Sequence, residues 1–216
     1  MDEEIYLHGI SAQTDLYDSR YILRVFESIL KSGELLSLRL QGIGKNSKRI
    51  GFNGLDYISL CDYEKRNLHF PDKISANSYT GYILYSLSLA FPKDKLDVIE
   101  PIKIEIPRRN YRYYFKEMEK YGMSENERYT DLADEAQVKD RIPLSLMNGI
   151  TIPVDKIYRI HYDRERYGYA IMKEVLKIEK LLAKYHYNVP IYDINTMESL
   201  QDGANIKRLV KEYYKK

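Results

Sequence analysis

The sequence predicts an α+β fold, because short segments rich in β-favouring residues dominate its first two-thirds and helical patterns dominate the rest. The strand-like segments do not alternate regularly with helices, which argues against a regular βαβ array. The chain has 216 residues, of which 44% are hydrophobic and 31% charged, as in an ordinary globular protein. This length is enough for one well-buried core. We therefore expect one mixed α+β domain.

The chain opens with a strand and a helix. Residues 4–10 favour a strand that ends in a loop beginning at His8. Asp18 or Ser19 can cap a helix that stops at Ser32-Gly33. The apolar positions of that helix recur with helical spacing at Ile22, Val25, Phe26, Ile29 and Leu30. The leucines at 35, 36, 38 and 40 then predict a second strand.

Further strands and helices follow. A turn at Asn53-Gly54 leads into a short buried strand that contains Tyr57, and alternation over 78–91 predicts a strand that Pro92 ends. Isoleucines between 99 and 106 suggest another extended segment, and 142–153 predicts a one-turn helix, a glycine stop and a strand. Helical spacing predicts a long helix over 163–186, a short extended piece at 189–194 and a helix within 196–216.

Charge and cysteine content limit the function classes only weakly. The 34 Lys and Arg against 32 Asp and Glu leave a net charge of +2, which gives no strong field for nucleic acid or membrane. The single cysteine, Cys61, excludes an internal disulfide and a cysteine-based zinc cluster, and no metal site is suggested. The acidic start and the lack of a long apolar run indicate a cytoplasmic protein with no membrane partner. The 22 tyrosines fit either AT-rich coding bias or surfaces for stacking bases and sugars.

Two basic segments each allow two interpretations. The loop Gly42-Ile43-Gly44-Lys45 is either a flexible connection or a phosphate contact, and it lacks the full spacing of a phosphate-binding loop. Residues 107–116 combine Arg108, Arg109 and Arg112 with aromatic rings. They either begin an amphipathic helix or bind nucleic acid through charge and stacking.

Three polar residues fall at the ends of predicted strands or within them: His8, Tyr57 and Glu135. The first lies in His8-Gly9-Ile10-Ser11, the second in Gly54-Leu55-Asp56-Tyr57-Ile58-Ser59, and the third opens a late strand. Their order resembles the His-Tyr-Glu class of ADP-ribosyltransferases, although this sequence has one extra residue between Gly54 and Tyr57. Two further segments resemble bacterial toxins that ADP-ribosylate DNA bases more closely. They are the stretch Ser28-Ile29-Leu30-Lys31-Ser32-Gly33-Glu34-Leu35-Leu36-Ser37 and the turn after Glu135 at Ile142-Pro143-Leu144.

The resemblance covers about residues 5–155 and implies a mostly antiparallel, split β-sheet with flanking helices. It implies NAD as the substrate, with Glu135 catalytic, His8 on a ribose, the Gly9 backbone on the nicotinamide amide and Tyr57 stacked on the nicotinamide ring. Ser11 belongs to the same NAD-binding motif. On this basis we expect residues 1–158 to form the catalytic domain. Residues 159–216 are expected to form a helical extension packed on it as one compact unit.

The acceptor of the ADP-ribose is less defined. Arginine-modifying relatives have a glutamate two residues before the catalytic one, and Ala133 stands there instead, so an arginine acceptor is disfavoured. The loop before Glu135 implies acceptor contacts at Tyr129, Thr130 and Asp131, and the run with Arg108, Arg109 and Arg112 would suit DNA or RNA. The resemblance also implies a bacterial or phage toxin or effector with an antitoxin or inhibitor protein. The alternatives are a non-catalytic nucleotide- or nucleic-acid-binding module, hydrolysis of NAD, and 2′-phosphotransfer using His69 or His161.

Overall fold

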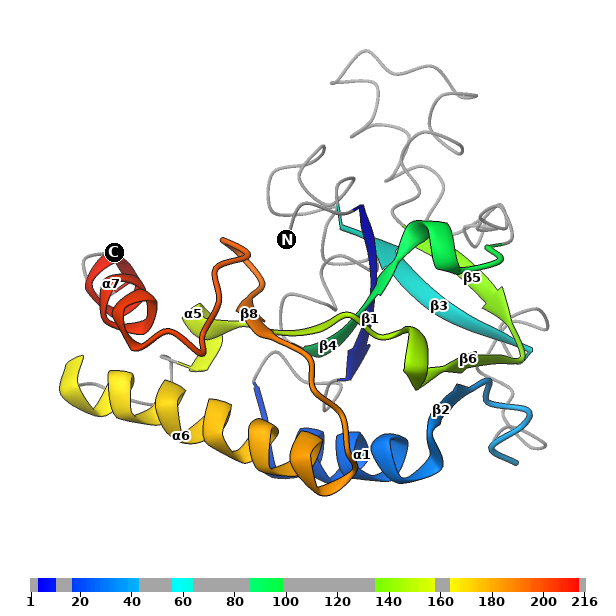
Figure 1. Ribbon diagram of the computed structural model, residues 1–216, viewed down its shortest axis with the longest axis horizontal. Coiled ribbons are helices and arrows are strands. Elements are labelled where there is room, and N and C mark those ends of the chain that lie inside the picture. Colours follow the sequence, from blue (N-terminus) through cyan, green and yellow to red (C-terminus); the bar gives the residue numbers. More distant parts are fainter. Residues whose placement is uncertain are drawn as a thin grey trace, which may run out of the picture.

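The structure is a computed structural model that describes residues 4–10, 17–42, 56–63, 86–98, 135–157 and 164–213. A six-stranded sheet, in the order β5-β3-β1-β4-β7-β8, lies beside a two-stranded sheet of β2 and β6 (Figure 1). The strands are β1 (Ile5–Ile10), β2 (Glu34–Leu36), β3 (Tyr57–Asp62), β4 (Leu87–Pro92), β5 (Glu135–Lys139), β6 (Arg141–Pro143), β7 (Gly149–Ile152) and β8 (Ile191–Asp193). The helices are α1 (Ser19–Ser32), α5 (Val154–Ile157), α6 (Arg164–Lys184) and α7 (Gly203–Tyr213), with single 3₁₀ turns η4 (Lys93–Lys95) and η5 (Leu144–Leu146).

The predicted α+β class is confirmed. The neighbouring strands of the large sheet pair antiparallel from β5 through β7. Only the β7–β8 pair within the described sheet is parallel. This pair brings the C-terminal part of the chain into the sheet, because β8 comes after the long helix α6.

Helix α1 begins and ends where its local signals place it. The Asp18 carboxylate accepts hydrogen bonds from the backbone N–H groups of Arg20 and Tyr21, which closes the first turn. Gly33 ends the helix in the left-handed conformation, with φ of 75°, and its N–H donates to the carbonyls of Ile29 and Leu30. The buried face of the helix carries Ile22, Phe26 and Leu30.

The strand predicted from the leucines at 35–40 is shorter than expected. It ends at Leu36, and the chain then turns, with the Gln41 N–H bonded to the Ser37 carbonyl and the Gly42 N–H bonded to the Arg39 carbonyl. Leu40 is exposed, so it supplies no buried face that a longer strand would need. The alternation of leucines at 36, 38 and 40 was therefore a misleading signal.

One face of the large sheet forms the main core. Leu60, Leu89 and Ile150 on three of its strands are fully buried. The core includes the buried faces of α1 and α6, which run along the same side of the sheet (Figure 1). A buried carboxylate joins these helices, since Glu174 of α6 accepts hydrogen bonds from the Tyr17 hydroxyl at 3.1 Å and the Ser19 hydroxyl at 2.7 Å.

The opposite face of the sheet has a different composition. It carries a smaller apolar cluster of Ile5, Leu7, Cys61, Ala90 and Ile194. Side chains alternate between the faces along a strand, so Gly9 of β1, Ser88 of β4 and Thr151 of β7 share this second face. We call it the small-residue face. Within the described ranges no helix is long and apolar enough to cross a membrane.

Candidate active site

His8 lies near the end of β1, where the chain separates from β3. Strand β1 pairs with β3 at Tyr6–Asp62 and Leu7–Cys61, whereas it pairs with β4 over its whole length. Beyond Leu7 a side chain joins the two strands, with His8 Nδ1 lying 2.9 Å from the Ser59 carbonyl oxygen. A carbonyl can only accept, so Nδ1 carries the proton in this contact. The imidazole thus holds β1 to β3 where the backbone pairing of these two strands stops.

The environment of His8 favours its neutral form. Burial lowers the pKa of His8 below its usual 6.5, because the charged imidazolium loses solvation, and the hydrogen bond to the Ser59 carbonyl opposes this effect. A neutral ring protonated on Nδ1 presents Nε2 as an acceptor. At neutral pH the imidazole is therefore an uncharged hydrogen-bonding group.

Gly9 and Tyr57 belong to the small-residue face. Gly9 lies directly opposite Ser88 of β4 and is buried. Tyr57 begins β3 and is half-buried. It lies four residues before Cys61 on the same strand, so the two side chains are on the same face of the sheet. By the same alternation His8 belongs to the main-core face, so its contact with the Ser59 carbonyl places the ring in the gap between the two strands.

Glu135 opens β5, as predicted, and its backbone is set by the sheet register. Glu135 lies opposite Cys61, and Cys61 lies opposite Leu7, so the glutamate is two strands from the residue before His8. Standard strand spacing puts its Cα roughly 10 Å from that of His8 and roughly 14 Å from that of Tyr57. A ligand that touches all three residues must therefore span more than one ring.

The remaining site residues lie outside the described part of the chain. These are Ser11 of the first motif, Arg108, Arg109 and Arg112 of the basic-aromatic run, and Tyr129, Thr130 and Asp131 before β5. The same holds for the strand predicted between 99 and 106 and for His69 and His161. Of the Gly42–Lys45 loop, only Gly42 is described, at a turn with φ of 71°. Of the predicted site residues, the structure thus places the backbones of His8, Gly9, Tyr57 and Glu135 on three neighbouring strands of the large sheet.

Two further residues of the small-residue face, Ser88 and Thr151, belong to no motif of the sequence. They lie directly opposite each other on β4 and β7, and both are 0% exposed. Neither hydroxyl has a hydrogen-bond partner within the described part of the chain. A signal existed in the alternating serines at 86 and 88 of an otherwise apolar strand, but only the register shows that Ser88 neighbours Gly9.

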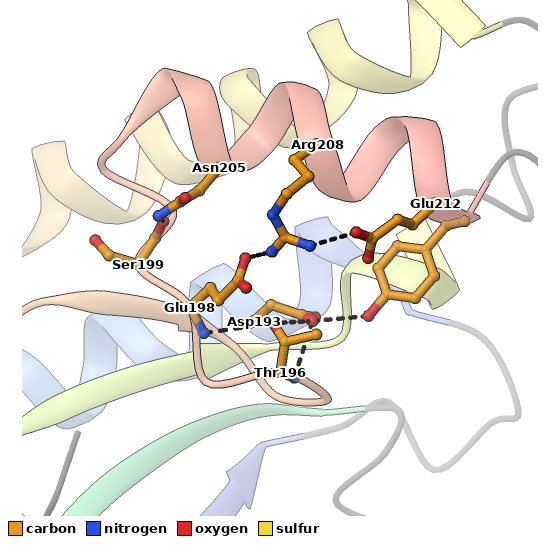
Figure 2. Close-up of polar contacts among 8 residues, drawn as sticks. Asp193, Thr196, Glu198, Ser199, Asn205, Arg208 and Glu212 are labelled. Atoms are coloured by element: carbon orange, nitrogen blue, oxygen red, sulfur yellow. Dashed lines mark hydrogen bonds and ion pairs between the residues drawn. The ribbon is translucent and has the colours of Figure 1, made fainter.

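A second polar cluster, at the C-terminal end, has a structural role. The buried carboxylate of Asp193 accepts hydrogen bonds from the Tyr213 hydroxyl at 2.8 Å, the Thr196 hydroxyl at 3.0 Å and the Val154 N–H at 3.3 Å. Burial nevertheless raises the pKa of Asp193. Figure 2 shows the cluster between β8 and α7, where Arg208 also bridges Glu198 and Glu212. These contacts fasten α7 to the sheet.

The described residues form no metal-binding cluster, and the single cysteine is buried. Among the residues that the structure describes, no three His, Cys, Asp or Glu side chains are placed to hold a metal ion. Cys61 is fully buried beside Leu7 in the apolar cluster of the small-residue face.

Comparison with known proteins gives structural matches. No family model matches the chain, and no curated protein matches it either. The structure is similar to that of Thermus sp. 2.9 DarT in complex with carba-NAD⁺, with a TM-score of 0.41, 14% sequence identity, and coverage of 88% of this chain and 95% of that chain. It is also similar to Thermus sp. 2.9 DarT in complex with NAD⁺, with a TM-score of 0.39, 13% identity and the same coverage. At these TM-scores the likeness assigns no role to any residue of this chain.

Proposed function

We propose that this protein transfers ADP-ribose from NAD to a macromolecular acceptor. The observation that carries the proposal is the register of three neighbouring strands, which sets His8, Gly9, Tyr57 and Glu135 around the place where β1 and β3 separate. These are the residues on which the sequence resembles His-Tyr-Glu ADP-ribosyltransferases, and they come from segments far apart in the chain.

The residues fit the chemistry of the substrate. Tyr57 offers a half-buried ring for the nicotinamide, and the neutral imidazole of His8 can accept a hydrogen bond from a ribose hydroxyl. When the bond between the ribose and the nicotinamide nitrogen breaks, its electron pair leaves with nicotinamide and positive charge grows on the sugar. The carboxylate of Glu135 would stabilise that charge until a nucleophile of the acceptor attacks and loses its proton.

The acceptor is a nucleic acid or a protein in this proposal. Arg108, Arg109 and Arg112 would meet phosphates, and Tyr129, Thr130 and Asp131 would meet the group that is modified. Ala133 disfavours an arginine acceptor. A cytoplasmic toxin or effector that is paired with an antitoxin or inhibitor protein is the biological role we infer.

The proposal is tested by incubating the chain with NAD labelled in its adenine ring, together with DNA, RNA or cell extract. We expect release of nicotinamide and label on one acceptor class, and we expect Glu135→Gln to slow release by about 10²–10³-fold. Glu165→Gln, at an exposed position on α6, is the control and should keep full activity. Release that Glu135→Gln leaves unchanged would remove Glu135 from the mechanism.

A non-catalytic binding module is the second candidate, and the basic-aromatic run favours it. In that case the chain would bind single-stranded nucleic acid with strong salt dependence and release no nicotinamide. Neutralising Arg108, Arg109 and Arg112 together would then reduce both the affinity and its dependence on salt.

A further inference from the structure

Helix α6, which runs along the lower edge of the molecule in Figure 1, exposes a stripe of large apolar side chains. Tyr169, Met172 and Leu176 are 67%, 50% and 52% exposed, and they are three of the five large hydrophobic side chains exposed in the described part of the chain. Their spacing of three and four residues puts them on one side of the helix. Ile171 and Ile178, on the side toward the sheet, are fully buried in the main core. We call the three exposed residues the α6 stripe, and a contiguous apolar surface of this kind marks a place of contact.

The charges around the α6 stripe are unevenly distributed. Lys173 and Lys180 each follow a member of the stripe by four residues, so they lie along one flank of it. Both lysines are exposed, and neither forms a salt bridge within the described ranges. Glu165 and Glu179 continue the spacing of the stripe beyond its two ends. The helix thus presents an apolar centre with a basic flank and acidic ends.

This arrangement of charge selects the class of partner. Nucleic acid and anionic lipid are uniformly negative, so they would attract the two lysines but repel the two glutamates. A phosphate backbone would also leave the apolar stripe uncovered. A second copy of the chain, packed antiparallel through the same stripe, would set its own lysines along the flank that already carries lysines. A protein helix with apolar residues at the matching spacing and acidic residues beside them complements both the stripe and its flank.

We propose that the α6 stripe and its lysine flank bind an acidic amphipathic helix of another protein. Apolar side chains of that helix would pack on Tyr169, Met172 and Leu176, and its carboxylates would pair with Lys173 and Lys180. No residue of the proposed NAD site lies on α6, so this surface is independent of the transfer reaction.

The probe is a designed, fluorescently labelled peptide of about 20 residues that forms an amphipathic helix. It carries leucines at the spacing of the α6 stripe and glutamates along both flanks of the leucines. Fluorescence anisotropy measures its affinity for the full chain, and we expect binding about 10-fold or more tighter than that of a peptide with the same composition in scrambled order. Leu176→Asp should weaken binding of the ordered peptide by about 10-fold, because it places a charge in the apolar contact.

Charge reversal tests the lysine flank. Lys173→Glu combined with Lys180→Glu should weaken binding by about 10-fold, and a peptide with lysines in place of its glutamates should restore it. The matched control is Lys207→Glu combined with Lys211→Glu, at two exposed positions of α7, and it should change the affinity little. All of these substitutions are at exposed side chains, and thermal melting establishes that each variant is folded.

Equal affinity for the ordered and scrambled peptides, or an equal loss in the α6 and α7 charge reversals, would overturn the proposal. Single-stranded DNA or phosphatidylserine vesicles that bind more tightly than the peptide, with the same dependence on Leu176, would assign the surface to another class of partner. Sedimentation of the wild type alone should show a monomer. Self-association that Leu176→Asp abolishes would instead assign the stripe to a second copy of the chain and overturn the proposal.

Discussion

His8 shows how one side chain can join fold and chemistry. Its Nδ1 proton is donated to the Ser59 carbonyl at the place where the backbone pairing between β1 and β3 stops. The same contact fixes the tautomer that offers Nε2 as an acceptor. Replacing this residue should therefore change both stability and ligand binding.

The lowered pKa of His8 predicts a specific pH dependence. Below pH 6.5, the usual pKa of histidine, His8 binds a proton in the unfolded chain. In the folded chain its lowered pKa keeps the ring neutral to a lower pH. The free energy of unfolding should therefore fall as the pH drops through 6.5 and level off below the folded-state pKa. We expect His8→Gln to remove this part of the dependence in urea unfolding curves from pH 8 to pH 5. Identical pH profiles for the two proteins would show that the folded state does not shift this pKa.

Tyr57 allows a test of stacking that is separate from catalysis. If its ring stacks on nicotinamide, Tyr57→Ala should weaken NAD binding by about 10- to 100-fold, because a stacked base contributes roughly 1–3 kcal/mol. Tyr57→Phe keeps the aromatic face and should bind within a few-fold of wild type. Calorimetric titration measures both affinities, and equal losses in the two variants would point to the hydroxyl instead of the ring.

The helices and strands that could be predicted from the sequence are those whose ends are set by neighbouring residues. Asp18, the apolar spacing and Gly33 define α1 without reference to the rest of the chain. The three-residue strands β2, β6 and β8 depend on pairing with distant segments, and so does the row that joins Gly9, Ser88 and Thr151. Propensity alone cannot supply such pairing. The sequence thus predicts His8, Tyr57 and Glu135 as site residues, whereas the row that contains Ser88 and Thr151 is visible only in the folded sheet.

The end of α1 provides an energetic test. Gly33 has φ of 75°, a conformation that is costly for residues with a Cβ, so Gly33→Ala should destabilise the protein by about 1 kcal/mol. Gly203, the first residue of α7, does not have a positive φ, and the space where a Cβ would lie is open. Gly203→Ala should therefore be neutral or slightly stabilising. Chemical denaturation measures both changes. Equal effects would contradict the left-handed cap.

At the scale of the whole molecule, the C-terminal part is tied into the sheet. Strand β8 pairs with β7, and the Tyr213 hydroxyl of α7 donates to the buried Asp193 carboxylate. Helix α6 meanwhile packs on α1 through Glu174. We therefore propose that residues 159–216 unfold together with the rest of the chain as one unit.

This proposal predicts the outcome of a single substitution. Tyr213→Phe removes the donor to Asp193 and should destabilise the whole protein by about 1–3 kcal/mol, with a single unfolding transition. Tyr169→Phe, at a side chain that is 67% exposed on α6, is the control and should change little. Two separate transitions, with only one of them shifted by Tyr213→Phe, would show that the C-terminal part is an independent unit.

In the proposed function, NAD binds around the opening between β1 and β3. The most direct measurement is a crystal structure of the Glu135→Gln variant, which should cleave NAD slowly, with NAD bound. We predict that the nicotinamide ring lies on Tyr57, its carboxamide beside Gly9, and the adjoining ribose within hydrogen-bonding distance of His8. NAD bound at another surface of the chain, or no NAD at saturating concentration, would show that the opening between β1 and β3 is not the binding site.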